Sequence, residues 1–246
     1  MIKKISSVSN TFIKELYKLK NTKNIQEQKT FLVENEHLLE MSKQYLKCIL
    51  TLNINENYDC DQYIVTKEIM EKLSSGKSPD RIIGLVHFPT VKPVSSKKII
   101  YLNKVQDPGN VGTIFRTALA FNYFDILCDN GCAFKYSSKV VAASQGAIFN
   151  LNIIDSCLTD LLYLKSQGYK IISTTLSPKS KKITDICRDF DKICIVFGNE
   201  GNGVDDEILK ISDEFLKIEI DNIDSLNVAV SAGIILYSFK SDDLIN

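Results

Sequence analysis

The sequence predicts an α/β protein in which a small domain precedes a larger one with a mostly parallel sheet. Short apolar runs alternate with segments of helical periodicity along the 246 residues. Several runs are apolar throughout, as in Ile193–Phe197, which is typical of strands covered on both faces. The proline-containing stretch Val91–Ser96 separates two such alternating regions. We therefore expect a small α/β domain over residues 1–92, a linker over 93–97 and a parallel-sheet domain over 98–246.

The first region begins with a helix signal. Asn10 is placed to cap a helix over Thr11–Leu19, which has an apolar stripe on one side and lysines on the other. The remaining elements expected here are a strand over Phe31–Val33, a helix near Glu36–Gln44, a strand over Cys48–Leu52, a helix from the cap Thr66 to Leu73, and a strand over Ile82–Phe88.

The second region has the stronger alternation of strands and helices. The expected strands are Ile99–Leu102, Asp125–Cys128, Asn150–Ile154, Lys170–Thr174, Lys192–Phe197 and Leu216–Ile220. The expected helices lie near Val111–Phe121, Ser138–Phe149, Leu158–Gln167, Asp205–Lys210 and Leu226–Phe239. This order predicts helices on both sides of the sheet.

Composition excludes several classes of protein. With 44% apolar and 24% charged residues, the chain has the composition of a soluble globular protein. No apolar run reaches the ~18 residues of a membrane helix, and no secretory signal precedes the first polar segment, so we expect a cytoplasmic protein without a membrane partner. The seven cysteines are scattered and only two histidines, His37 and His87, are present, so we expect reduced thiols and no metal site.

The charge is distributed unevenly although the net charge is zero. The first 97 residues carry 15 Lys and Arg against 11 Asp and Glu, and Met1–Lys29 alone carries seven Lys against two Glu. A basic first segment on a neutral chain is a weak indication of a polyanionic partner. The alternative is an ordinary solvated lysine face.

Three segments at the carboxyl ends of predicted strands carry unusual polar residues. In Asp107–Arg116 a strand ends, the chain turns and a helix begins, which places the helix N-terminus at the edge where open α/β sheets bind ligands. Asn110 and Arg116 are its candidate functional residues. The alternative is a surface cap and an arginine that extends from a core helix into solvent.

The second and third segments are a glycine-rich loop and the start of the last helix. Gly198–Gly203 holds three glycines around Glu200, but its spacing is neither a dinucleotide nor a P-loop motif. Glu200 is placed to hold a ribose hydroxyl or a basic side chain, unless the loop is only a flexible turn. In the third segment Ser225 is the expected N-cap and Asn227 lies in the first turn, where both can also be merely polar residues.

Taken together, the three segments resemble the motifs of the SpoU/TrmH family of RNA ribose 2′-O-methyltransferases, in the SPOUT superfamily. The similarity covers Asn103–Phe121, Phe197–Gly203 and Ser225–Tyr237, in the family's order and spacing. Two earlier segments, Ile5–Asn10 and Phe31–Leu39, loosely resemble the small RNA-binding domain that many members carry.

The resemblance implies a deep trefoil knot in the C-terminal domain, S-adenosylmethionine as cofactor and a homodimer through the knot domain. By connectivity rules alone we would expect an unknotted sheet. It also implies an RNA substrate, with ribosomal RNA favoured over transfer RNA. The implied catalytic residues are Asn110, Arg116, Glu200, Ser225 and Asn227. The implied cofactor-binding residues are Thr174, Leu176, Gly198, Ile218, Leu226 and Asn227.

For methyl transfer, we expect Arg116 to bind the phosphate and stabilise developing alkoxide, because an arginine pKa above ~12 makes it a poor base. Asn110 is expected to orient Arg116 or the ribose, and Glu200 to hold Arg116 or substrate. Ser225 and Asn227 are expected to hydrogen-bond the substrate phosphate or ribose.

The chain departs from the family pattern at several positions. Asn35 and Asn122 stand where the family usually has glycine, and Asn199 stands where it usually has proline. The segment Ile218–Ile220 also differs from the usual Ile-Pro-Met. These changes concern the shapes of loops and leave the expected polar site residues in place.

Four alternatives to this function remain open. One is a ribose methyltransferase of transfer RNA, and another is a non-catalytic knotted RNA-binding protein. Base methylation is the third, although Ser225-Leu226-Asn227 favours ribose. A nicotinamide-dependent oxidoreductase is the fourth, but the chain lacks its glycine fingerprint.

Overall fold

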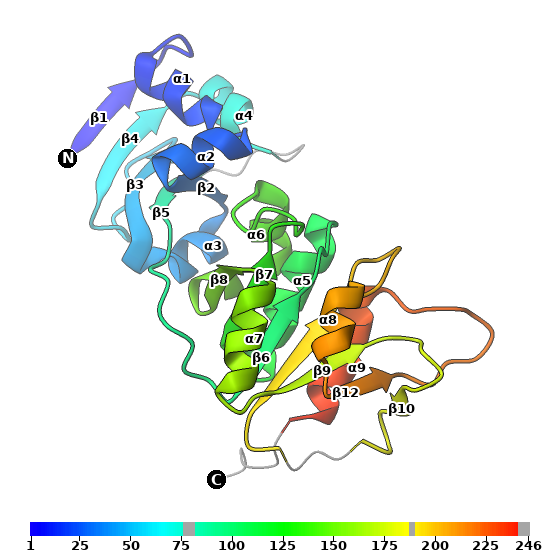
Figure 1. Cartoon of the computed structure of the whole chain (residues 1–246). Helices are drawn as coiled ribbons and strands as arrows, with labels where there is room; N and C mark the ends of the chain where they lie inside the picture. Colours follow the sequence, from blue (N-terminus) through cyan, green and yellow to red (C-terminus); the bar gives the residue numbers. More distant parts are fainter. Residues whose placement is uncertain (76–81, 187–189, 241–246) are drawn as a thin grey trace.

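The computed structural model describes residues 1–75, 82–186 and 190–240, and it contains two β-sheets joined by a segment without regular structure (Figure 1). The first sheet has five strands in the order β1-β4-β3-β5-β2. The second has seven strands in the order β10-β12-β9-β11-β6-β7-β8. The chain is therefore an α/β protein with a small sheet followed by a larger one, as the sequence predicts.

The small domain mixes parallel and antiparallel pairing. Strands β1, β4 and β3 are parallel, and β5 runs antiparallel to both β3 and β2. Its elements are β1 (Ile2–Ile5), α1 (Thr11–Lys18), α2 (Thr22–Gln28), β2 (Thr30–Glu34), α3 (Glu36–Met41), η1 (Lys43–Tyr45), β3 (Leu46–Thr51), β4 (Asp61–Val65), α4 (Lys67–Leu73) and β5 (Ile82–His87). Every element predicted for this region is present. Three further elements, β1, α2 and β4, were not predicted.

In the large domain every strand pair is parallel. Its strands are β6 (Lys98–Leu102), β7 (Asp125–Asp129), β8 (Asn152–Ser156), β9 (Lys170–Thr174), β10 (Lys181–Lys182), β11 (Ile193–Phe197) and β12 (Glu214–Lys217). Its helices are α5 (Pro108–Ala120), α6 (Ser138–Ser144), η2 (Ala147–Phe149), α7 (Leu158–Ser166), α8 (Asp206–Ile211) and α9 (Val228–Ser238).

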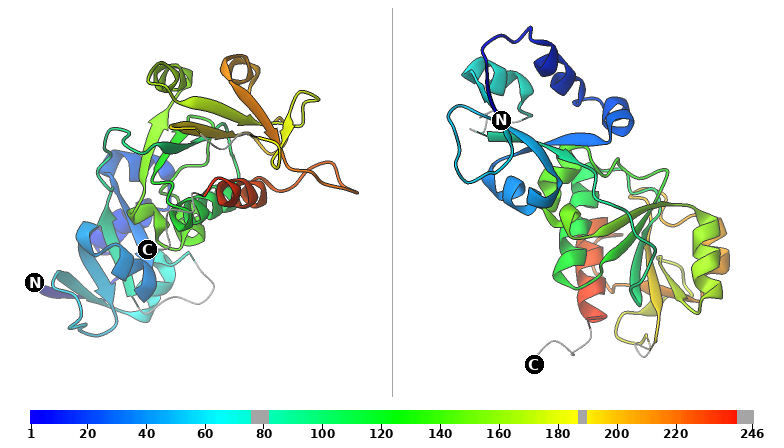
Figure 2. Two further views of the ribbon diagram at one scale, coloured as in Figure 1. Left: turned by 90° about the horizontal axis from the view of Figure 1, so that it is seen from below. Right: turned by 90° about the vertical axis from the view of Figure 1, so that its left-hand side faces the viewer.

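Helices cover both faces of the large sheet, as Figure 2 shows from below. Helices α7 and α8 pack on one face, where they meet Ile99 and Tyr101 of β6. Helices α5 and α9 pack on the other face, against Ile100 and Leu102 of the same strand. Successive residues of β6 thus belong to different cores, which explains why the central strands are apolar throughout.

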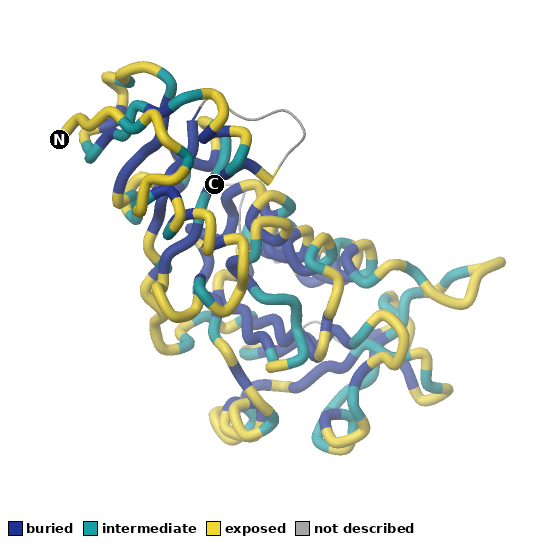
Figure 3. Tube along the Cα trace, turned by 90° about the horizontal axis from the view of Figure 1, so that it is seen from above, coloured by how far each residue is buried: buried dark blue, intermediate teal, exposed yellow. Residues whose placement is uncertain are grey.

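Several boundaries differ from the prediction. The helix expected over residues 138–149 is interrupted, because Gln145 and Gly146 have φ angles of 48° and 85° that an α-helix cannot accommodate. The strand expected over residues 150–154 begins later, at Asn152. The strand expected over 216–220 is β12, which ends at Lys217, and the chain beyond it forms a projecting loop that Figure 3 shows as largely exposed.

The segment between the sheets is hydrogen-bonded to the large domain. Lys92 and Asn152 exchange two hydrogen bonds, each of 2.9 Å, through the Lys92 backbone and the Asn152 amide. The backbone N–H groups of Ser95 and Ser96 donate to the Asp125 carboxylate at 3.0 and 2.7 Å. Burial acts to raise the pKa of Asp125, but hydrogen bonds from the Ser96 and Asn152 side chains, together with these backbone bonds, outweigh it and lower the pKa. The connection is therefore held in place at one edge of the large sheet.

Aromatic rings join the two domains. Phe88 of the connecting segment stacks on Tyr136 of the large domain with ring centroids 3.9 Å apart. The ring centroid of Phe31 in β2 lies 5.0 Å from that of Tyr136 and 6.0 Å from that of Phe149. Phe31, Tyr136 and Phe149 are buried. The domains thus share one apolar core at their junction.

Asn122 occupies a position at which the family usually has glycine. It has φ 63° and directly follows Phe121, the C-cap of α5. Its N–H donates to Leu119 O and the N–H of Tyr123 donates to Ala118 O, which is the pair of bonds that closes a Schellman motif. Asparagine tolerates this left-handed conformation better than other residues with a side chain, so it replaces glycine here.

We expect Asn122→Ala to lower the free energy of unfolding by about 1 kcal/mol, because alanine bears the full steric cost of a left-handed backbone. Asn122→Gly should be neutral or stabilising. Chemical denaturation at neutral pH measures both, with Asn53→Ala, an exposed asparagine of negative φ, as the control. Equal stability of the alanine and glycine variants would contradict this account.

Candidate functional site

The first of the three predicted segments forms the start of α5 at the carboxyl end of β6. Asp107 is the N-cap, and its Oδ1 accepts a hydrogen bond from Asn110 N at 2.8 Å. Pro108 is the first helical residue, where its missing N–H costs nothing. The glycine-rich loop follows β11, the parallel neighbour of β6. The two segments therefore meet at the same edge of the sheet.

A chain of side-chain hydrogen bonds joins all three segments. Asn227 Nδ2 donates to Asn110 Oδ1 at 2.9 Å, and Asn110 Nδ2 donates to Glu200 Oε1 at 3.0 Å. The direction of this chain is set at Asn227, whose Oδ1 accepts from Ala229 N and Val230 N at the start of α9. Because that oxygen is occupied, the nitrogen of Asn227 faces Asn110, and the nitrogen of Asn110 in turn faces the carboxylate.

The Glu200 carboxylate accepts further hydrogen bonds from the backbone before α5. Gln106 N donates to Oε2 at 3.2 Å and Asp107 N donates to Oε1 at 3.1 Å. Partial burial acts to raise the pKa of Glu200, but the hydrogen bond from Asn110 and those from backbone N–H groups outweigh it, so the pKa is lowered. Glu200 therefore stays ionised and holds the first two segments together.

The glycine loop needs glycine at two positions. A Cβ at Gly198 would overlap the backbone of Gly203 and Val204, because Asn199 and Gly203 exchange two backbone hydrogen bonds of 2.9 Å across the loop. Gly203 itself has φ 71°, a conformation that favours glycine. The loop is thus a compact turn that presents its backbone to the neighbouring space.

Asn199, which replaces the usual proline, fixes this loop by hydrogen bonds. Its Oδ1 accepts from Gly201 N at 2.9 Å and Asn202 N at 3.0 Å. Its Nδ2 donates to Lys104 O at 2.8 Å, which ties the loop to the first segment. We infer that this amide replaces the stiffness of the proline ring.

A cavity of about 600 Å³ lies beside this network. It is enclosed by the ends of β9 and β12, the glycine loop and the start of α9, and it is large enough for a small-molecule ligand. Glu200 and Ser225 line it as well. All the cofactor-binding residues predicted from the sequence line this cavity: Thr174, Leu176, Gly198, Ile218, Leu226 and Asn227.

One of the two alternatives predicted for Asn110 and Glu200, a contact with Arg116, was wrong. Within the described ranges its guanidinium makes no ion pair or hydrogen bond, while Asn110 and Glu200 bind each other instead. Arg116 is exposed, and six residues of helix place it roughly 240° around α5 from Asn110, so it does not reach the Glu200 carboxylate. This leaves a permanent positive charge available to an anion from outside the chain.

The predicted N-cap of the last helix was also wrong. Asn227, not Ser225, caps α9, and its φ and ψ of −54° and 138° are those of a cap residue. Ser225 lies two residues earlier, exposed at the wall of the cavity. Ser225 and Asn227 are both residue types that cap helices, and the helical periodicity of the sequence did not distinguish between them.

Sequence reasoning missed a buried amide beneath the site. Asn103 is 1% exposed and follows β6 directly. Its Nδ2 donates to the carboxylates of Asp129 at 2.7 Å and Asp205 at 3.1 Å, and its Oδ1 accepts from Asp205 N at 2.8 Å. Lys104 adds an ion pair with Asp205 at 2.6 Å. A polar residue immediately after a fully apolar strand was the signal that could have identified it.

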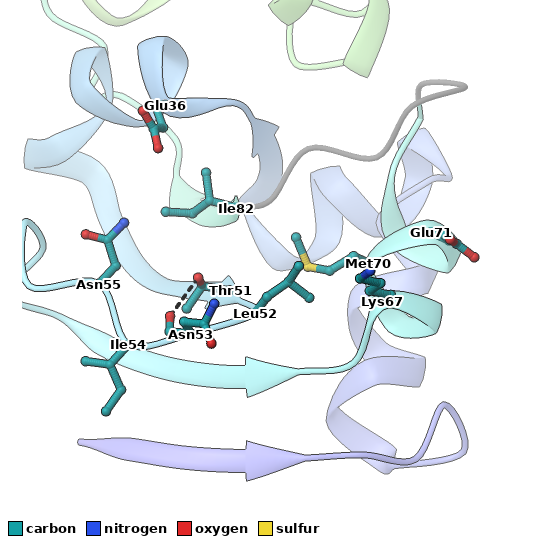
Figure 4. Close-up of a pocket in the computed structure, with 10 residues that line it drawn as sticks. All are labelled: Glu36, Thr51, Leu52, Asn53, Ile54, Asn55, Lys67, Met70, Glu71 and Ile82. Carbon is teal, nitrogen blue, oxygen red and sulfur yellow. Dashed lines mark hydrogen bonds between the residues drawn. The ribbon is translucent and has the colours of Figure 1, made fainter.

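A second cavity, of about 470 Å³, lies in the small domain where β3 ends (Figure 4). Its lining combines the carboxylates of Glu36 and Glu71 with Lys67 and apolar side chains. None of the three segments reaches it, so we assign the functional site to the first cavity. In the described part of the chain no group of three or more His, Cys, Asp or Glu could hold a metal ion. Nor does any helix there have the length and apolarity to cross a membrane.

Solved structures of RNA methyltransferases share this fold along the whole chain. An AdoMet-bound rRNA methyltransferase from Sinorhizobium meliloti superposes with a TM-score of 0.89 at 21% identity, covering 100% of this chain and 99% of that one. An RNA 2′-O ribose methyltransferase superposes with a TM-score of 0.81 at 25% identity, covering 96% and 97%. The fold is that of this class of methyltransferases.

Sequence comparison identifies the family. The profile of the SpoU rRNA methylase family matches residues 97–237, which include all three segments. The 23S rRNA (guanosine(2553)-2′-O)-methyltransferase RlmP of Bacillus subtilis is 29% identical over 251 residues, covering 97% of this chain and 100% of that protein. The chain belongs to the SpoU rRNA methylase family, which confirms the resemblance drawn from the sequence.

We expect Glu200→Gln to lower the free energy of unfolding by about 1 kcal/mol at neutral pH, because the donors around it lose a charged acceptor that solvent partly screens. The folded pKa of Glu200 lies below its ordinary 4.5, so its stabilisation is complete above pH 4.5 and is lost as pH falls through the folded value.

The stabilities of wild type and Glu200→Gln should therefore converge in acid, which denaturation curves over a pH series would show. The control is Glu207→Gln, an exposed glutamate of α8 outside the network. A stability difference between wild type and Glu200→Gln that is the same at every pH would rule out the carboxylate as its cause.

Proposed function

We propose that this chain transfers a methyl group from S-adenosylmethionine to the 2′-OH of a ribose in RNA, and that ribosomal RNA is the substrate. The observation that carries the proposal is the chain of hydrogen bonds from Asn227 through Asn110 to Glu200, which joins three distant segments beside one cavity. Family membership and the full-length similarity to a 23S rRNA methyltransferase support it.

The cavity fits the cofactor. Apolar side chains of Leu176, Ile218 and Leu226 offer walls for an adenine ring, and Gly198 lets the glycine loop close compactly at the edge of the cavity. Thr174 keeps its own hydroxyl bonded to Val196 O at 2.9 Å, so it shapes the wall and does not donate to the ligand. When bound, the cofactor supplies an electrophilic methyl group on a sulfonium.

The two asparagines of the hydrogen-bond network, of which Asn227 lines the cavity, retain donors for the substrate. Each carboxamide has two N–H groups, and one from Asn227 and one from Asn110 are used within the network. The second N–H of each is left for a ribose hydroxyl or phosphate oxygen. Because Glu200 and the α9 cap fix both amides, these donors are oriented before the substrate binds.

Arg116 supplies the positive charge. Its guanidinium is exposed and unpaired with any described residue, which suits a phosphate next to the reacting ribose. A guanidinium bound at that phosphate lowers the free energy of the developing alkoxide through its positive charge. We therefore assign Arg116 to phosphate binding and electrostatic stabilisation.

We expect Arg116→Ala to lower the rate of methyl transfer roughly 100-fold or more, because the charge acts on the transition state, with little change in cofactor affinity. The assay follows labelled methyl from S-adenosylmethionine into unmodified ribosomal and transfer RNA fractions, and calorimetry measures cofactor binding. The control is Lys170→Ala, which changes an exposed lysine at the amino-terminal end of β9, the end away from the cavity.

Label in alkali-resistant dinucleotides of the ribosomal fraction would support the proposal. Label confined to transfer RNA would change the substrate, and label in a base would change the reaction. If the wild-type protein binds RNA but does not bind the cofactor and transfers no labelled methyl, it is a non-catalytic RNA-binding protein.

We also propose a homodimer that forms through the knot domain. Val230, Ile234 and Tyr237 are 51%, 40% and 65% exposed on α9, and their spacing of four and three residues places them on one face of the helix. An exposed apolar stripe of this kind suits a helix that packs across a two-fold axis. The trefoil knot of the same domain is part of this proposal and is supported by family membership.

We expect Ile234→Asp to convert the dimer to a monomer, because a carboxylate in an apolar interface is left desolvated and unpaired. Light scattering after size-exclusion chromatography measures the mass. The control Leu162→Asp changes a residue of α7 that is 45% exposed and should leave the mass unchanged. A wild-type monomer would refute the proposed dimer.

A further inference from the structure

An exposed tyrosine of the small domain lies between two lysines from different elements. Tyr17 of α1 is 45% exposed. Lys20 Nζ lies 5.2 Å from the centroid of its ring, and Lys72 Nζ lies 5.4 Å from it. Lys20 follows α1, and Lys72 is in the last turn of α4, which packs beside α1 (Figure 1). One aromatic ring and two positive charges thus share one small surface.

This arrangement is held by the fold. Lys20 Nζ donates to Ser74 O, just beyond the end of α4, at 3.0 Å, which links α1 and α4. On the inner side, Ile13 and Leu16 are buried and fix the orientation of α1. The tyrosine ring is therefore presented to solvent by a helix that cannot rotate.

The surroundings favour a polyanion. Lys14 and Lys18 are also exposed on α1, and the nearest acidic side chain on that helix, Glu15, is paired with Lys18 at 2.7 Å. Tyr17 and Lys20 belong to the segment Met1–Lys29, which carries seven lysines against two glutamates. It lies outside residues 97–237, which the family profile matches, so it is distinct from the methyl-transfer site.

We propose that Tyr17, Lys20 and Lys72 form a binding site for an unpaired nucleotide of RNA. The base stacks on the Tyr17 ring, and the two ammonium groups move from the ring to the flanking phosphates. An exposed cation–π contact is weak compared with a base–aromatic stack plus two phosphate contacts, so RNA displaces the resting contacts. This binding site stands independently of the proposed methyl transfer. Only the statement that the bound RNA is the methylation substrate rests on the proposed function.

The ring distinguishes RNA from other polyanions. An acidic peptide could pair with the lysines, but it offers the Tyr17 ring no flat aromatic partner. A regular RNA duplex keeps its bases stacked inside and presents only phosphates and riboses. The geometry therefore favours a single strand, loop or bulge.

The test measures binding of labelled oligouridylate and of a mixed-sequence RNA duplex to the full-length chain by fluorescence anisotropy over a salt series. We expect Tyr17→Leu to weaken oligouridylate binding about tenfold without changing duplex binding, and Tyr17→Phe to bind like wild type. Lys20→Gln combined with Lys72→Gln should lower the slope of log affinity against log salt by roughly 0.7 for each phosphate that a lysine no longer neutralises. The control is Lys23→Gln, which changes an exposed lysine of α2 and tests whether removal of any surface lysine lowers the salt slope equally.

Ultraviolet cross-linking of wild type to oligouridylate should place the modified peptide at Tyr17. Equal oligouridylate affinity of wild type and Tyr17→Leu would overturn the proposal. The proposal would also be overturned if polyglutamate displaced the RNA equally well from wild type and from Tyr17→Leu. If Tyr17→Leu unfolds, the lysine variants and the cross-link decide.

Methyl transfer and cofactor binding, measured in parallel, separate this site from the proposed function. A wild-type chain that binds oligouridylate through Tyr17 but transfers no methyl group would refute the enzyme and support this site. A chain that methylates RNA with the same KM after Tyr17→Leu would refute this site and support the enzyme.

Discussion

The carboxamide of Asn110 is the contact on which the rest of the site depends. It accepts from Asn227 at the start of α9 and donates to Glu200 in the glycine loop, so one side chain holds segments that are 117 and 90 residues away in sequence. Both of these partner segments line the cavity, together with the ends of β9 and β12. Loss of this amide would leave Glu200 held only by backbone donors and would remove the side-chain hydrogen bond between α5 and the cap of α9.

Much of the fold was predictable because the signals were local. Continuous apolar runs identified the strands of the large sheet, and Thr66 marked a helix start that the structure confirms. Helix α5 begins at Pro108, three residues before the expected Val111. The partners of Arg116 were not predictable, since a helical segment does not reveal which side chains on other elements it faces. The choice of Asn227 over Ser225 as cap depended on its distance to Ala229 N and Val230 N, which spacing alone does not give. The knot, the homodimer and the cytoplasmic location stay predictions.

Two of the departures from the family pattern share one physical explanation. Asn35 and Asn122 have φ of 71° and 63°, so each stands where a positive φ made glycine the usual residue. Each contributes in return: Asn35 caps α3 through Leu38 N, and Asn122 completes the Schellman motif after α5. Asn199 likewise replaces the stiffness of proline by three hydrogen bonds. Changes that looked like losses in the sequence preserve the backbone by other means.

The separation in sequence between Asn110 and its partners has a consequence for how the protein is made. Closing loops of this length carries an entropy cost that local contacts do not offset, so parallel sheets with distant pairings fold slowly. During synthesis, Asn110 leaves the ribosome long before Asn227 exists, and until then its amide has no partner at α9. The large sheet can begin to form around β6 and β7, but the cavity gains its last wall only after the start of α9 has been synthesised. A nascent chain therefore cannot acquire its proposed activity before α9 has emerged from the ribosome.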